Sequence, residues 1–129
     1  MRTADELLAD VRAGLSRLTP TEAFEAARNG AVIVDTRSED ERRRQGWLVP
    51  GALDHPLSTV LWRLDPSVDT SNAKLPLETE VVVICREGYS SSFAAAWLQQ
   101  LGFEQVTDVI GGIDAWLRAR LPLERYGQE

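Results

Sequence analysis

The chain has 129 residues, of which 43% are hydrophobic and 26% charged, values typical of one soluble globular domain spanning residues 1–129. Its net charge of -6 argues against a general nucleic-acid or anionic-membrane partner, because phosphate contacts need a surplus of lysine and arginine. A single cysteine and a single histidine exclude an intramolecular disulfide and a cysteine-based zinc site.

The first part of the chain predicts two helices. Apolar residues recur at helical spacing between Asp5 and Leu18, which indicates an amphipathic helix and an N-terminal helical extension over residues 1–18. Thr19 can cap a second helix, which we expect to begin at Pro20 and to run to about Arg28.

Short apolar runs that alternate with helical patterns follow. Strands are predicted at Ala31–Val34, Val81–Ile84 and Gln105–Val109. Helices are predicted at Leu57–Leu64, Ser91–Leu101 and Ile113–Arg120. Loops are predicted at the charged segment Thr36–Gln45 and at Asp65–Glu78. This alternation predicts an α/β fold with a mainly parallel sheet and helices on both faces.

Cys85 stands where chemistry is expected, directly after the apolar strand Val81–Ile84. Open α/β sheets place their ligand sites at the carboxyl ends of such strands. Gly88 permits a tight turn, and Ser90 and Ser91 are candidates to cap the next helix. Amide N–H groups that converge in this turn, together with the positive end of a helix, would stabilise a thiolate. The sequence therefore predicts a reactive cysteine in an anion-binding loop.

Four motifs in the same order resemble the rhodanese family. They are the strand end Asp35-Thr36-Arg37 with Glu41, the turn Pro50-Gly51-Ala52, the loop Cys85 to Ser91 with glycine fourth, and Gly111-Gly112 with Ala115-Trp116. Each motif alone is weak, but the ordered set is specific. The resemblance spans nearly the whole chain and implies a three-layer α/β/α domain with a mainly parallel central sheet.

The resemblance also implies an activity. Cys85 would accept sulfur as a persulfide, and a loop of six residues would bind the anionic substrate: Arg86, Glu87, Gly88, Tyr89, Ser90 and Ser91. A ping-pong reaction is expected, in which a sulfane donor such as thiosulfate loads the cysteine and cyanide or a thiol unloads it. Asp35, Arg37 and Glu41 would form a structural ion-pair network. No cofactor and no metal are implied.

Glu87 departs from the common family pattern, since many relatives carry lysine or a neutral residue there. Its negative charge should weaken thiosulfate binding, and Arg86 should partly offset it. One alternative is therefore a carrier module that takes persulfide sulfur from a protein partner and uses thiosulfate poorly.

Two other functions stay open at this point. Phosphatases with a related loop need an arginine six residues after the cysteine, and that position is Ser91. A regulatory domain without catalysis is the other alternative, although such domains usually lack the cysteine.

The remaining candidates have simpler interpretations. His55 is expected to be a surface or packing residue, and Arg42-Arg43-Arg44 a mixed charged face that could gather anions. Trp97 and Trp116 are expected to face inward, whereas Trp62 could line the edge of a pocket.

The expected location is the cytoplasm. Met1 to Asp10 lack the apolar run of a secretory signal, and no window approaches the ~20 apolar residues that span a bilayer. A lone cysteine is consistent with that reducing compartment.

Overall fold

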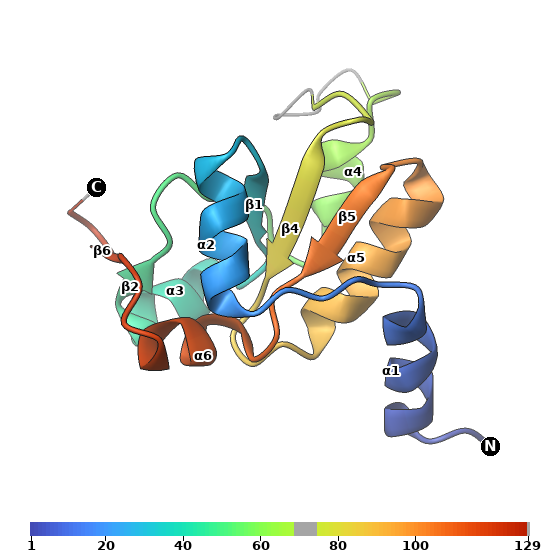
Figure 1. The fold of residues 1–129 in the computed structure, drawn as a ribbon, viewed down its shortest axis with the longest axis horizontal. Helices are drawn as coiled ribbons and strands as arrows, with labels where there is room; N and C mark the ends of the chain where they lie inside the picture. The colour runs from blue at the N-terminus through green and yellow to red at the C-terminus, as the bar shows by residue number, and fades with distance from the viewer. Residues whose placement is uncertain (69–74, 129) are drawn as a thin grey trace.

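Parallel strands form the centre of the molecule in the computed structural model, which describes residues 1–68 and 75–128 (Figure 1). The sheet has the order β3-β1-β4-β5, and all three neighbouring pairs are parallel. Its strands are β1 (Val32–Asp35), β3 (Leu53–Asp54), β4 (Glu80–Ile84) and β5 (Gln105–Asp108). The α/β architecture and the three predicted strands are confirmed.

Helices cover both faces of this sheet. They have to, because apolar side chains of β4 point alternately to one face and to the other. Val81 and Val83 point into a core built with α4 (Val60–Leu64) and α5 (Ser90–Leu101). Val82 and Ile84 point into the opposite core, built with α2 (Pro20–Arg28) and α6 (Gly112–Arg118). These four side chains of β4 are fully buried, and only Glu80 at its start is exposed. A central strand with two buried faces explains why its sequence is continuously apolar.

The predicted N-terminal helix is shorter than expected. α1 (Ala4–Ala13) starts with a capping box between Thr3 and Glu6 and ends at Gly14, and it packs against α5 (Figure 1). The chain then runs extended to Leu18, which forms a parallel bridge with Val109 beside the sheet. α2 has the predicted bounds and a second capping box.

The charged segment predicted as a loop contains a helix. α3 (Glu39–Gln45) is held at its start by Ser38, whose side chain accepts a hydrogen bond from the Glu41 N–H while the Glu41 carboxylate accepts one from the Ser38 N–H. A capping box forms without any apolar periodicity, so the hydrophobic pattern missed this helix.

Three elements of two residues each were also missed. Besides β3, a small antiparallel pair joins β2 (Trp47–Leu48) to β6 (Glu124–Arg125). The other expected helices form, with α4 beginning only at Val60. Part of the predicted loop Asp65–Glu78 lies outside the described residues. No helix in the described part of the chain is long and apolar enough to cross a membrane.

Candidate active site

The carboxyl ends of β1 and β4 meet at one edge of the sheet, because Asp35 pairs with Ile84. Cys85 therefore emerges next to the segment that follows β1. A pocket of about 260 Å³ opens there. It is lined by Thr36, Arg37, Glu41, Leu57, Cys85, Arg86, Glu87, Tyr89 and Ser90. The cysteine is only 5% exposed, so ligands reach it through this pocket.

The loop after Cys85 turns its backbone toward the sulfur. The Gly88 N–H donates a hydrogen bond to Cys85 Sγ at 3.2 Å. Gly88 has φ +88°, and a Cβ atom on it would lie 2.7 Å from the Gly111 nitrogen. Both the backbone angle and this close packing require glycine there. An N–H group that points at sulfur, with the α5 N-terminus following it, favours negative charge at this atom.

The Gly111-Gly112 motif has a direct physical role in holding this loop. The Ile113 N–H donates to the Cys85 carbonyl at 2.9 Å, and the Asp114 N–H donates to the Arg86 carbonyl at 3.1 Å. A Cβ atom on Gly112 would lie 2.3 Å from the Cys85 carbonyl oxygen. The first turn of α6 thus holds the backbone carbonyls of Cys85 and Arg86, the first two residues of the loop, in place.

The predicted loop residues fall into two groups. Arg86, Glu87, Tyr89 and Ser90 line the pocket, and the first three are exposed at its rim. Ser91 does not line it, because its fully buried hydroxyl donates a hydrogen bond to Asp108 Oδ2 at 2.7 Å.

The expectation that Ser90 and Ser91 cap the helix is wrong. Tyr89 occupies the N-cap position of α5, and among the described residues no side chain caps that end. Ser91 and Ser92 instead both donate to the buried Asp108 carboxylate, the latter at 2.8 Å. Their hydroxyls form hydrogen bonds to a buried carboxylate and not to the free N–H groups at the start of the helix.

Two arginines of the N-terminal region also reach the loop, and sequence reasoning missed both. Arg12 and Arg17 donate to the Gly88 carbonyl at 2.7 Å and 3.1 Å. Arg17 also forms an ion pair with Asp108 at 2.8 Å, and Arg12 donates to Ser92 at 3.1 Å. We define these residues, Arg12, Arg17, Ser91, Ser92 and Asp108, as the loop anchor. Of these five residues, sequence reasoning had singled out only Ser91, and for a different role.

The predicted ion-pair network needs a correction. Arg37 and Asp35 form a buried pair at 2.7 Å, and Arg37 further donates to the Trp47 carbonyl at 2.9 Å. Glu41 has a different partner, the Ser38 N–H of the α3 cap at 3.0 Å. It therefore closes the helix start and lines the pocket instead of joining the ion pair.

His55 lies near this edge without lining the Cys85 pocket. It is 4% exposed, and within the described ranges neither ring nitrogen has a hydrogen-bond partner. Burial lowers the pKa of His55, and the positive charge of Arg63 lowers it further. The ring is thus a neutral packing group, and the surface alternative is wrong.

The three consecutive arginines do not act together. Arg42 is buried and donates to the Arg37 carbonyl at 2.8 Å. Arg43 and Arg44 are exposed and pair with Asp40 on the same helix, so the predicted mixed charged face describes these two residues.

Comparison with known proteins agrees with this geometry. A family model, the rhodanese-like domain, matches residues 19–119. Thiosulfate sulfurtransferase GlpE of Haemophilus influenzae is 30% identical over 107 residues, covering 83% of this chain and 92% of the relative. GlpE of Actinobacillus pleuropneumoniae is 34% identical over 110 residues, covering 84% and 93%.

Solved structures share the fold. A Rhodopseudomonas palustris protein of unknown function, described as a possible tyrosine phosphatase, has a TM-score of 0.87 at 26% identity and covers 96% of both chains. A rhodanese-related protein of Thermoplasma volcanium has a TM-score of 0.67 at 23% identity, covering 84% of this chain and 96% of the other. With its cysteine loop at the edge of a parallel sheet and the family match over most of its length, this chain belongs to the rhodanese-like domain family of sulfurtransferases.

Proposed function

We propose that this protein transfers sulfane sulfur through a persulfide on Cys85, with residues 1–129 acting as one rhodanese-like unit and residues 1–18 as its extension. The observation that carries the proposal is the Gly88 N–H aimed at Cys85 Sγ at 3.2 Å, inside a pocket that has Arg86 at its rim. An outer persulfide sulfur would carry a negative charge into that same pocket, where loop amides and Arg86 can stabilise it.

In the loading step, the Cys85 thiolate attacks the outer sulfur of thiosulfate. A bond forms between Sγ and that sulfur, and the sulfur–sulfur bond of thiosulfate breaks. Its electron pair leaves with sulfite, and one negative charge stays on the new persulfide. In the unloading step, cyanide or a thiolate attacks the outer sulfur and the electron pair returns to Cys85. Sulfur moves between carriers, so neither step needs an external oxidant or a metal.

Glu87 favours the second candidate, a carrier that receives sulfur from a protein persulfide. Its exposed side chain lines the same small pocket as Arg86 and opposes a doubly charged donor more strongly than a singly charged persulfide. Both candidates use the Cys85 persulfide and differ only in the donor.

A phosphatase activity is not favoured. The guanidinium that would hold a phosphoryl group is replaced by Ser91, whose hydroxyl is bound to Asp108. Arg12 and Arg17 lie near the loop, but both bind the Gly88 carbonyl from outside the pocket lining. Hydrolysis of p-nitrophenyl phosphate that disappears in Cys85→Ser would contradict this assignment.

Intact mass spectrometry tests the proposal directly. Incubation with thiosulfate should add about 32 Da, one sulfur, and a cyanide chase should remove it and yield thiocyanate. Cys85→Ala should show no added mass, and no second cysteine can substitute for it. Loading by a protein persulfide but not by thiosulfate would identify the carrier. Loading by neither donor would overturn the proposal.

A further inference from the structure

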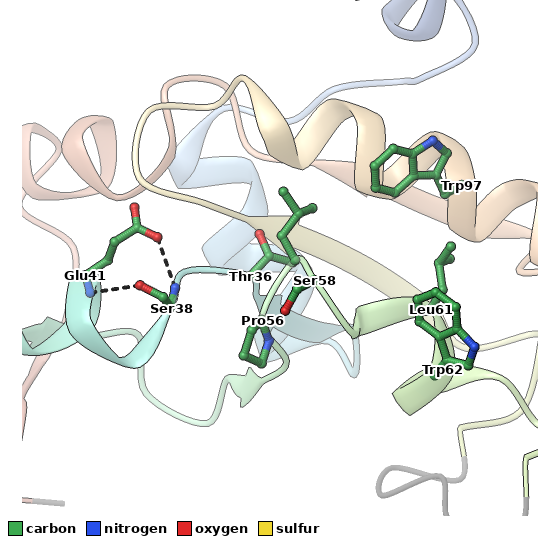
Figure 2. A pocket seen from close by; sticks show the side chains of 9 residues that line it. Thr36, Ser38, Glu41, Pro56, Ser58, Leu61, Trp62 and Trp97 are labelled. Atoms are coloured by element: carbon green, nitrogen blue, oxygen red, sulfur yellow. Dashed lines mark hydrogen bonds between the residues drawn. The ribbon is translucent and has the colours of Figure 1, made fainter.

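Figure 2 shows the lining of an apolar groove. This groove has a volume of about 690 Å³ and lies beside the Cys85 pocket. Its lining comes from the segment after β1, from the region around α4 and from α5, and consists of Thr36, Ser38, Glu41, Pro56, Leu57, Ser58, Leu61, Trp62 and Trp97. Figure 2 shows Glu41 and Ser38 at one end and Leu61, Trp62 and Trp97 at the other. The volume is that of a site for a small organic molecule.

The groove and the Cys85 pocket are neighbours that share part of their lining. Thr36, Glu41 and Leu57 line both of them. A molecule that occupies the groove can therefore extend a reactive end to the sulfur of Cys85. The shared lining places the groove directly beside the pocket that gives access to the cysteine.

Its aromatic end is exposed. Trp62 is 63% exposed and Trp97 is 38% exposed, although large aromatic side chains usually bury most of their surface. Trp97 is held in place by a ring contact with Phe93, with centroids 6.4 Å apart. Two exposed indole rings from different helices on one concave surface indicate that an apolar ligand completes it.

The chemistry of the groove does not suit thiosulfate. A small dianion needs amide N–H groups and cations, and those lie in the Cys85 pocket at Gly88 and Arg86. The groove offers rings and aliphatic side chains, and the carboxylate of Glu41 at its end opposes an anion. Donor and acceptor can therefore be recognised by different parts of one site.

We propose that the groove binds the uncharged apolar body of the sulfur acceptor, a low-molecular-weight thiol with an aromatic or branched aliphatic group. This inference rests on the persulfide function proposed above. The acceptor thiolate attacks the outer persulfide sulfur, a bond forms between these two sulfur atoms, and the bond from that sulfur to Cys85 Sγ breaks. The electron pair returns to Sγ, and the acceptor leaves as its own persulfide.

Discharge of the preloaded Cys85 persulfide tests the groove separately from loading. The probes are 2-phenylethanethiol and ethanethiol, alkyl thiols that differ in their apolar bodies, and the readout is loss of the added sulfur mass over time. Each rate is divided by the rate of cyanide discharge of the same variant. The phenyl compound should be preferred by about 10-fold, since an apolar pocket discriminates by this order for small apolar groups.

In the Trp62→Ala/Trp97→Ala double variant, the ratio of the normalised discharge rates of the two thiols should fall toward one. Leu117→Ala is the matched control, because it shortens a partly exposed apolar side chain outside the groove and should keep the preference. Equal rates for the two thiols in the wild type, or an unchanged preference in the double variant, would overturn the groove assignment. Failure to load the cysteine would instead contradict the proposed function.

Discussion

At the scale of single residues, the pocket holds opposite charges on neighbouring positions. Arg86 and Glu87 are both exposed at the rim, within reach of an anion that approaches Cys85. Exposed charges contribute at most about 1 kcal/mol each, which limits either residue to roughly a fivefold effect on binding. Charge at this rim should therefore adjust donor affinity without deciding whether transfer occurs.

Substitutions at these two positions test that argument. Arg86→Ala should raise the half-saturating thiosulfate concentration by about fivefold or less, and Glu87→Gln should lower it by a similar factor. The measurement is steady-state thiocyanate formation at varied thiosulfate. Glu25→Gln and Arg28→Ala, which change the same charges on α2, serve as controls. Equal thiosulfate dependence of all four variants would show that rim charge is irrelevant.

At the scale of elements, the N-terminal region holds the Cys85 loop from outside the matched family region. Arg12 and Arg17 precede residue 19, where the family match begins, yet both bind the Gly88 carbonyl. In a trans peptide the C=O and the following N–H point in opposite directions. Holding this carbonyl therefore turns the Tyr89 N–H away from the two guanidinium groups and limits the loop to one orientation.

Removing the loop anchor should affect stability and loading together. Arg17→Ala leaves the fully buried Asp108 without its cation and should lower the free energy of unfolding by about 3 kcal/mol. Arg12→Ala removes two hydrogen bonds and a cation–π contact with Tyr89 and should cost about 1 kcal/mol. Both should slow persulfide formation by thiosulfate.

Urea unfolding and the time course of sulfur loading measure these two effects. Arg28→Ala is the reference variant, because its ion pair with Glu25 is exposed. If Arg17→Ala unfolds at the same urea concentration as Arg28→Ala, the anchor does not stabilise the loop.

Elements and site residues were predictable where their signals are local. The buried strands and the Cys85 turn are read directly from short runs of sequence, because a strand enclosed on both faces must be apolar throughout. Strands of two residues are too short to show an alternating hydrophobic pattern. The loop anchor joins Gly88 to residues more than 70 positions away in the sequence. Such pairings depend on tertiary packing, which no local pattern encodes.

Trp97 illustrates a wrong prediction with a clear cause. Trp97, which shares one face of α5 with Phe93 and Leu101, is predicted by the sequence to face inward. The helix instead buries the adjacent face most deeply, with Ala94, Ala95 and Leu98 fully enclosed. Small residues allow α5 to lie close to the sheet, so the indole is left on the outer side, where it lines the groove.

At the scale of the whole molecule, His55 links folding to pH. Burial, with the charge of Arg63, lowers its pKa below the value near 6.5 that an unfolded chain has. Below about pH 6.5, down to the lowered pKa of the folded protein, the unfolded chain therefore binds a proton that the folded chain does not, and the free energy of unfolding falls as the pH drops. Above that pH both states hold a neutral ring, and this contribution to the pH dependence vanishes.

The pH effect can be isolated with a variant that does not titrate there. Between pH 7.5 and pH 5.5, urea unfolding should show a larger loss of stability for the wild type than for His55→Asn, with a slope difference of at most about 1.4 kcal/mol per pH unit. Carboxylates titrate alike in both proteins, so the difference reports His55, the one histidine of the chain. Parallel pH profiles would mean that the folded protein protonates His55 as readily as the unfolded chain does. The buried ring would then have to lie open to solvent.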